Sequence, residues 1–133
     1  MILVDSSVWI DLFCNVANRQ TDRLTALLKA GDALVCTGDL ILMELLQGAK
    51  DDLRAQKIAR RMSIIPAIAI SDVGLVVMAA DNYRTLRARG ITVRKTIDTL
   101  IATRCILDGY PLLYSNRDFD PFVEHLGLQS AMA

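Results

Sequence analysis

The chain has 133 residues, of which 53% are hydrophobic, so it can bury a sizeable core and does not have the composition of a disordered segment. Its 15 Lys and Arg residues equal its 15 Asp and Glu residues in number, so the net charge does not point to nucleic acid as a strongly basic balance would. Any such binding must come from a local patch or a bound metal. This length predicts a single domain over residues 1–133.

The first half of the chain is predicted to combine short strands with helices. The aliphatic run at residues 2–4 has the pattern of a buried strand, and Asp5 with the two serines after it can cap a helix. Thr37 is a candidate cap for a later helix that stops at Gly48. In chain order we predict a strand at 2–4, helices at 8–13 and 21–29, a strand at 33–36, and helices at 37–47 and 51–62.

The second half continues the alternation. Residues 64–70 are β-like but contain Pro66, which cannot donate to a sheet ladder and makes a poor central strand. Ser71 is a candidate cap for a long helix that ends at Gly90. A helix at 96–107, a strand at 111–114 and a short helix at 120–125 follow.

This alternation predicts an α/β domain with a mainly parallel central sheet flanked by helices on both faces. In such folds the ligand crevice lies at the carboxyl ends of the strands. Residues that directly follow a strand are therefore the first candidates for a functional site.

The chain is expected to lie in the cytoplasm, away from membranes. Cys14, Cys36 and Cys105 have no zinc-binding spacing and are predicted to be reduced core thiols. The first residues lack the basic segment of a signal peptide, and no apolar run reaches the ~18 residues that span a bilayer.

Four acidic residues are candidates for a shared site. Asp5 directly follows the first predicted strand, and Asp118 comes soon after the last one, so both are expected at the same edge of the sheet. Glu44 lies in an apolar helix that contains no Lys or Arg to pair with it, and a buried carboxylate is costly unless it is paired or bound to metal. Asp98 lies in the first turn of its helix. Taken singly, Asp5 could be an ordinary cap, Asp98 a partner of the helix dipole, and Asp118 a turn residue.

Carboxylates that converge in one cleft raise one another's pKa unless a cation neutralises them. Oxygen ligands select a hard cation, Mg²⁺ with Mn²⁺ as a substitute, and such a site is typical of phosphodiester hydrolysis. The only histidine of the chain, His125, lies near its end, so a histidine cluster is not available.

The chain resembles the VapC-type toxins of the PIN-domain family. Four segments carry the resemblance, in family order: residues 1–10 (MILVDSSVWI), 40–49 (LILMELLQGA), 96–102 (TIDTLIA) and 115–120 (SNRDFD). The resemblance implies a PIN-like three-layer sandwich, metal-dependent endonuclease action on RNA, a homodimer, and inhibition by a cognate VapB-type antitoxin. It assigns the acidic quartet to Asp5, Glu44, Asp98 and Asp118.

Other residues near these motifs are candidate auxiliaries. Ser6 and Ser115 match positions where relatives often carry a small hydroxyl residue, which can orient a carboxylate or a water molecule; each is equally explained as a cap or a turn residue. Asn116 stands where many relatives have an aspartate, so Asn116 or Asp120 is an alternative to Asp118 as the fourth ligand. The pattern Asp120-Pro121 favours a helix cap for Asp120.

Basic residues adjoin the Asp98 helix. Arg94 and Lys95 are candidate RNA-binding residues, because phosphate contacts dominate affinity for nucleic acid. The leucine-rich helices near the start, with Trp9 and Phe13, are predicted to be covered in part by a second copy or an antitoxin helix.

Two alternatives remain open. A PIN-like module that binds RNA or a partner without cleaving it would also fit, since Asn116 leaves the fourth acidic position in doubt. A phosphoacceptor signalling domain would need paired acids after the first strand and a lysine after the last, whereas Ser6 follows Asp5 and no lysine follows Tyr114.

Overall fold

A computed structural model describes residues 1–31 and 34–132. In it, four parallel strands form one sheet in the order β3-β2-β1-β4. The strands are β1 (Ile2–Val4), β2 (Val35–Gly38), β3 (Ala67–Ile68) and β4 (Leu112–Leu113). The predicted α/β class with a parallel sheet is confirmed.

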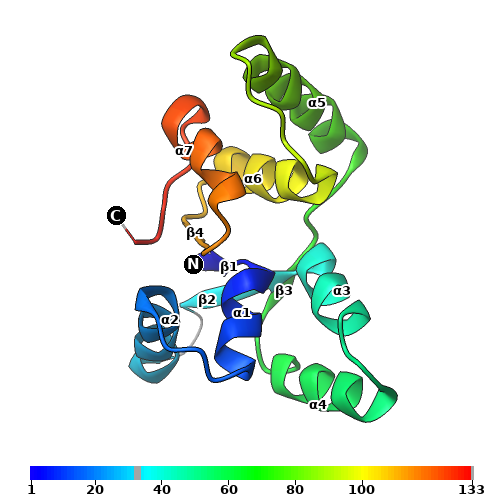
Figure 1. Cartoon of the computed structure of the whole chain (residues 1–133), viewed down its shortest axis with the longest axis vertical. Coiled ribbons are helices and arrows are strands. Elements are labelled where there is room, and N and C mark those ends of the chain that lie inside the picture. The colour runs from blue at the N-terminus through cyan, green and yellow to red at the C-terminus, as the bar shows by residue number, and fades with distance from the viewer. Residues whose placement is uncertain (32–33, 133) are drawn as a thin grey trace.

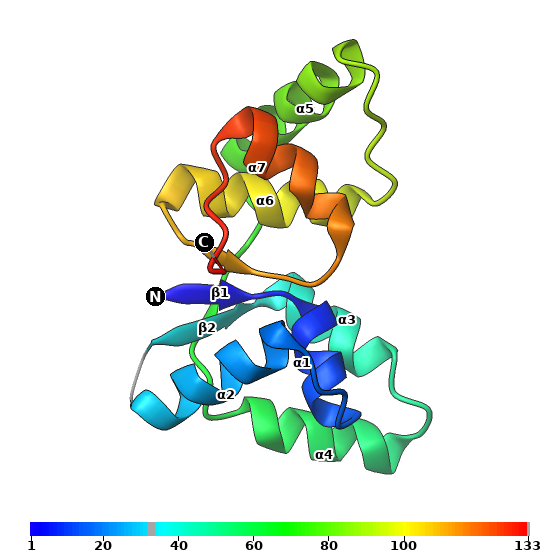
Figure 2. The same ribbon diagram turned by 60° about the vertical axis from the view of Figure 1, so that its left-hand side comes forward.

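Helices cover both faces of the sheet, so the molecule has three layers (Figure 1). One layer contains α1 (Ser6–Phe13), α2 (Arg19–Ala30), α3 (Asp39–Gln47) and α4 (Asp52–Met62); the other contains α5 (Val73–Ala88), α6 (Thr96–Asp108) and α7 (Asp120–Leu126). The N-terminus leads into the interior strand β1, and a bridge between Leu112 and Ser130 places the C-terminal segment beside β4 (Figure 2).

The central strands are buried because their residues are apolar on both faces. Leu3, Val4, Cys36, Leu112 and Leu113 are fully buried. Each pairs with a neighbouring strand in parallel register: Leu3 lies opposite both Cys36 and Leu112. These contacts bring the ends of β1 and β4 to the same edge, which places Asp5 beside the segment that follows Leu113.

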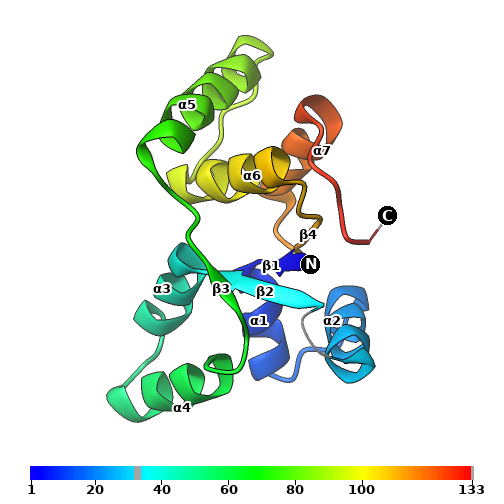
Figure 3. The same ribbon diagram turned by 180° about the vertical axis from the view of Figure 1, so that it is seen from behind.

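Strand β3 is an edge strand, as Pro66 predicts. It is two residues long, pairs with β2 only, and carries the chain from α4 in one layer to α5 in the other (Figure 3). Pro66 lies directly before this edge strand, and the Pro66 carbonyl accepts a hydrogen bond from the Thr37 N–H.

Three predicted caps are wrong. Thr37 is buried inside β2, and Gly38 takes the N-cap position of α3. Asp72 rather than Ser71 caps α5, because its carboxylate accepts the N–H of Leu75 at 2.8 Å. Asp120 lies inside the first turn of α7 and makes no cap bond.

Several element boundaries also differ from the predicted ones. The long helix stops at Ala88 rather than at Gly90, and a 3-10 turn at Arg117–Phe119 was not predicted. The predicted strand at 33–36 is shifted to Val35–Gly38, and its first residue, Ala33, lies outside the described residues. Cys36 and Cys105 are buried thiols, but Cys14 is exposed, so it is not a core residue. Within the described residues, no helix combines the length and the apolar character needed to cross a membrane.

Candidate active site

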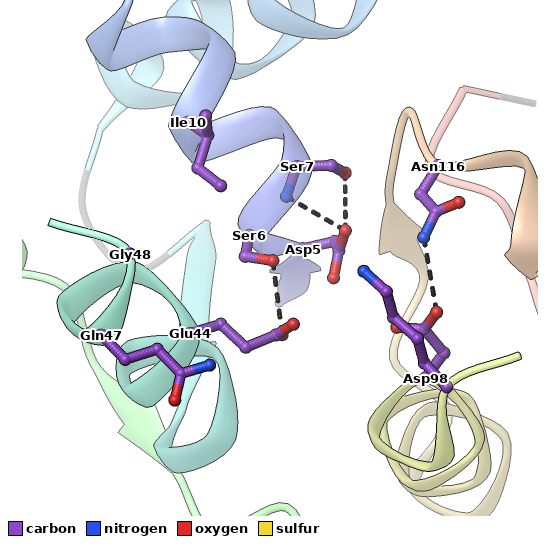
Figure 4. A pocket seen from close by; sticks show the side chains of 10 residues that line it. Asp5, Ser6, Ser7, Ile10, Glu44, Gln47, Gly48, Asp98 and Asn116 are labelled. Carbon is purple, nitrogen blue, oxygen red and sulfur yellow. Dashed lines mark hydrogen bonds between the residues drawn. The ribbon is translucent and has the colours of Figure 1, made fainter.

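Asp5 stands at the junction between β1 and α1. It is 3% exposed and caps α1: its Oδ2 accepts the backbone N–H of Ser7 at 3.1 Å and the Ser7 hydroxyl at 2.5 Å. The Asp5 side chain is nevertheless buried and faces the cleft shown in Figure 4. Capping is therefore only part of what its position allows.

Glu44 reaches the same cleft from α3, which lies in the same layer as α1. It is half-buried, and its Oε1 accepts the hydroxyl of Ser6 at 3.3 Å (Figure 4). Helix α3 packs against α1, and its buried residues are Ile41 and Leu45. Since Glu44 is three residues after Ile41 on the same helical side, the burial of that side directs Glu44 towards the end of β1.

Asp98 enters from the opposite layer. It lies in the first turn of α6 and is 3% exposed. Its Oδ2 accepts a long bond of 3.4 Å from the side-chain amide of Asn116, which follows β4 (Figure 4). The parallel sheet thus brings together three carboxylates that are far apart in the sequence.

Burial and neighbouring charges both act on the three carboxylates. Burial raises the pKa of Asp5. Burial and the charge of Asp5 raise the pKa of Glu44, and the same two causes raise the pKa of Asp98 to about 6. Lys95 opposes these shifts at all three residues. The site therefore carries more negative charge than its surroundings neutralise.

The cleft has a volume of about 550 Å³. Its lining includes the three carboxylates, Lys95 and the following polar or small residues: Ser6, Ser7, Gln47, Gly48 and Asn116. Carboxylate, hydroxyl and amide oxygens are the donors that Mg²⁺ and Mn²⁺ prefer. The donor chemistry fits such an ion, but within the described residues no three acidic, His or Cys side chains lie close enough, as they stand, to hold it together.

The fourth predicted acid is held differently. Asp118 forms an ion pair with Arg94 at 2.9 Å, and its N–H donates to Oδ1 of Asn116. It does not line the cleft, although its charge contributes to the raised pKa of Asp98. The structure therefore brings together Asp5, Glu44 and Asp98, with Asp118 at the rim.

The auxiliary candidates separate into two groups. Ser6 and Asn116 contact the carboxylates directly. Asp120 points elsewhere, since its Oδ1 accepts the hydroxyl of Tyr114 at 2.8 Å. In the described part of the chain the Ser115 hydroxyl has no hydrogen bond to the acidic residues; the backbone N–H of Ser115 donates to the Ser7 hydroxyl at 3.3 Å instead.

Sequence reasoning missed Ser7. This residue bonds Asp5 through both its N–H and its hydroxyl and also contacts the segment after β4. Its position two residues after a capping aspartate was an available signal, because a cap bonds the N–H two or three residues later.

Known proteins were compared with the chain in sequence and in structure. The model of the PIN domain family matches residues 2–123. VapC ribonuclease Mb1587 of Mycobacterium bovis and Ribonuclease VapC11 of Mycobacterium tuberculosis are each 32% identical to the chain over 131 residues, which is 98% of both proteins in each comparison.

Solved structures share the fold. The chain matches VapBC2 from Rickettsia felis, solved with a DNA fragment from its promoter, with a TM-score of 0.76 at 18% identity, covering 98% of this chain and 97% of that one. It matches VapBC-1 from nontypeable Haemophilus influenzae with a TM-score of 0.74 at 18% identity, covering 98% and 96%. These structural matches show the fold alone. The family match and the two mycobacterial relatives show that the chain belongs to the VapC ribonucleases of the PIN-domain family.

Proposed function

We propose that the chain is a Mg²⁺-dependent endoribonuclease that acts as the toxin of a toxin–antitoxin pair, and that Asp5, Glu44 and Asp98 hold the metal. The observation that carries this proposal is the convergence of these three carboxylates, from β1, α3 and α6, on one cleft. Two of them are buried, and all three have raised pKa values. A divalent cation is the ligand that would relieve this repulsion.

The chain's own residues position the acids for that role. Ser7 holds Oδ2 of Asp5, Ser6 holds Oε1 of Glu44, and the Asn116 amide lies against Oδ2 of Asp98. Such bonds restrict the rotation of each carboxylate and favour its charged form. When bound, Mg²⁺ would supply positive charge beside the phosphate and lower the pKa of a water molecule. In this assignment Asp118 is a fourth, outer acid that Arg94 partly neutralises.

RNA cleavage by the purified chain tests the proposal. We expect total RNA to be cut in the presence of Mg²⁺ or Mn²⁺, and the cutting to stop in excess EDTA or in the Asp98→Asn variant. Glu124→Gln, an exposed substitution on α7 away from the cleft, is the matched control. Cleavage that persists in EDTA and in Asp98→Asn would show that the chemistry lies elsewhere.

A second surface fits the antitoxin. A groove of about 420 Å³ is lined by residues of α1, α3 and α4, among them the apolar Phe13 and Ile58 and the basic Arg54, Lys57 and Arg61; the Arg61 guanidinium lies over the Phe13 ring. It shares Ile10, Glu44 and Gly48 with the acidic cleft. We propose that an amphipathic antitoxin segment with acidic residues binds here, because its apolar and acidic side chains would match the apolar and basic residues of the lining. Trp9, by contrast, is a core residue at 2% exposure.

A third surface fits a second copy of the chain. Helix α5 exposes four large apolar side chains: Val73 is 84%, Val77 61%, Val76 42% and Met78 41% exposed, and the three valines lie on one side of the helix. A self-associating helix face buries such residues symmetrically. We propose that α5 forms the homodimer contact.

We also propose that residues 1–133 fold as one domain around a shared core. The RNA substrate would place the activity of this domain in the cytoplasm.

A further inference from the structure

Lys95 is the basic residue among those that line the acidic cleft in the described part of the chain. It precedes α6 at the N-cap position, with an extended backbone (φ −121°, ψ 122°) and no side-chain cap bond. This placement puts its side chain at the cleft and leaves its ammonium group without a role in stabilising the helix. An aspartate or a serine would be the favourable residue for an N-cap, so helix capping does not explain a lysine here.

The neighbouring cation is engaged differently. Arg94 donates to Asp118 at 2.9 Å, outside the cleft lining. Lys95 forms none of the ion pairs closer than 4.0 Å in the described residues, although its charge acts on Asp5, Glu44 and Asp98 together. The Lys95 charge therefore acts on the three carboxylates as a group and not on a single ion-pair partner.

The Lys95 side chain is also able to move out of the cleft. Its side chain is exposed, so its flexible four-carbon stem can swing into solvent without unpacking the core. A buried lysine at this place would be a permanent part of the structure. An exposed one is a charge that a stronger cation can replace.

We propose that Lys95 is the resident counter-cation of the acidic cleft in the metal-free protein, and that a divalent cation displaces its ammonium group when it binds. This inference rests on the proposed metal-dependent function. In this inference Lys95 is a positioning residue with two opposite effects. Its charge stabilises the metal-free fold and weakens the affinity of the cleft for metal. The physical reason is that a lysine and a divalent cation satisfy the same carboxylates.

The test uses Lys95→Met, which keeps the length of the side chain and removes its charge. Lys95→Arg keeps the charge, and Lys29→Met, at an exposed position in the last turn of α2, is the matched control. Each full-length protein is stripped of metal, melted, and titrated calorimetrically with Mn²⁺ at about pH 8, which is above the raised pKa of about 6 of Asp98.

We expect Lys95→Met to melt about 3 °C below the wild type without metal and to bind Mn²⁺ roughly tenfold more tightly. Lys95→Arg and Lys29→Met should match the wild type in both measurements. If Lys95→Met binds Mn²⁺ with wild-type or weaker affinity, the competition is overturned while the proposed metal site stands. If no variant and no wild-type protein binds Mn²⁺, the proposed metal site fails, and the displacement fails with it.

Discussion

The hydroxyl of Ser7 lies 2.5 Å from Oδ2 of Asp5, to which it donates, and it also accepts the backbone N–H of Ser115 at 3.3 Å. One serine in the first turn of α1 therefore links the acid after β1 to the segment after β4. Its two bonds to Asp5 are the largest influences that lower the pKa of this buried carboxyl group.

We expect Ser7→Ala to reduce Mn²⁺ affinity and RNA cleavage roughly tenfold or more, since loss of a group that orients a metal ligand commonly has this effect. Calorimetric titration and a cleavage assay measure the two quantities. Ser115→Ala is the matched control, because the backbone rather than the hydroxyl of Ser115 makes the contact. Equal losses in both variants would count against a specific role for Ser7.

Glu44→Gln separates a functional carboxylate from a structural one. The side chain is half-buried and its pKa is raised by burial and by Asp5, so removal of the charge should leave the metal-free melting temperature unchanged or higher. RNA cleavage should be lost. Glutamine keeps an oxygen that can accept the Ser6 hydroxyl, so the contact at 3.3 Å need not disappear. A fall in melting temperature of several degrees would instead indicate that Glu44 supports the fold.

The stability of the metal-free protein should depend on pH through Asp98. Its pKa is raised from 3.8 to about 6 in the folded protein, mainly by burial and by the charge of Asp5. The folded state thus binds the proton more tightly than the unfolded chain, so this contribution is complete below the unfolded pKa and is lost as the pH rises through about 6.

We therefore expect the metal-free protein to melt at a lower temperature at about pH 7 than at about pH 5. Asp98→Asn should reduce the difference, and saturating Mn²⁺ should raise the melting temperature at the higher pH. Melting curves with EDTA and with Mn²⁺ decide this. A metal-free protein that becomes more stable between these two pH values would be opposite to the expected sign.

Asp118 and Asp120 form a matched pair for the fourth acidic position. Asp118 pairs with Arg94 at the rim, so Asp118→Asn should lower the cleavage rate, though less than the loss of an acid inside the cleft. Asp120 accepts the Tyr114 hydroxyl, and Asp120→Asn should keep both that bond and the rate. Single-turnover cleavage by the two variants tests this order. An inactive Asp120→Asn beside an active Asp118→Asn would move the fourth ligand two residues along the chain.

The α5 face is tested by its effect on oligomeric state. Val77→Asp places a charge at the centre of the exposed apolar face and should convert a dimer into a monomer, because a buried unpaired charge is costly in an interface. Ile64→Asp, at a residue that is 83% exposed outside α5, is the control and should leave the dimer intact. Sedimentation of the three proteins gives the result; a wild type that sediments as a monomer removes the proposed contact.

The sequence by itself determined the fold class and the acidic candidates. Short apolar runs and Pro66 before the edge strand are local signals, because strand periodicity and a missing N–H each act within a few residues. Glu44 was identifiable for a similar reason: a carboxylate in an apolar helix without a basic neighbour conflicts with its surroundings.

Only the tertiary structure decided which polar groups share each site. Asp118 pairs with Arg94 across 24 positions, and Asp120 turns to Tyr114 because the chain enters a 3-10 turn at Arg117. Lys95 and Asn116 reach acids on other elements through contacts set by strand register and by helix packing across the sheet. Such long-range partners depend on how the layers close around Asp5, and local sequence patterns carry no information about that closure.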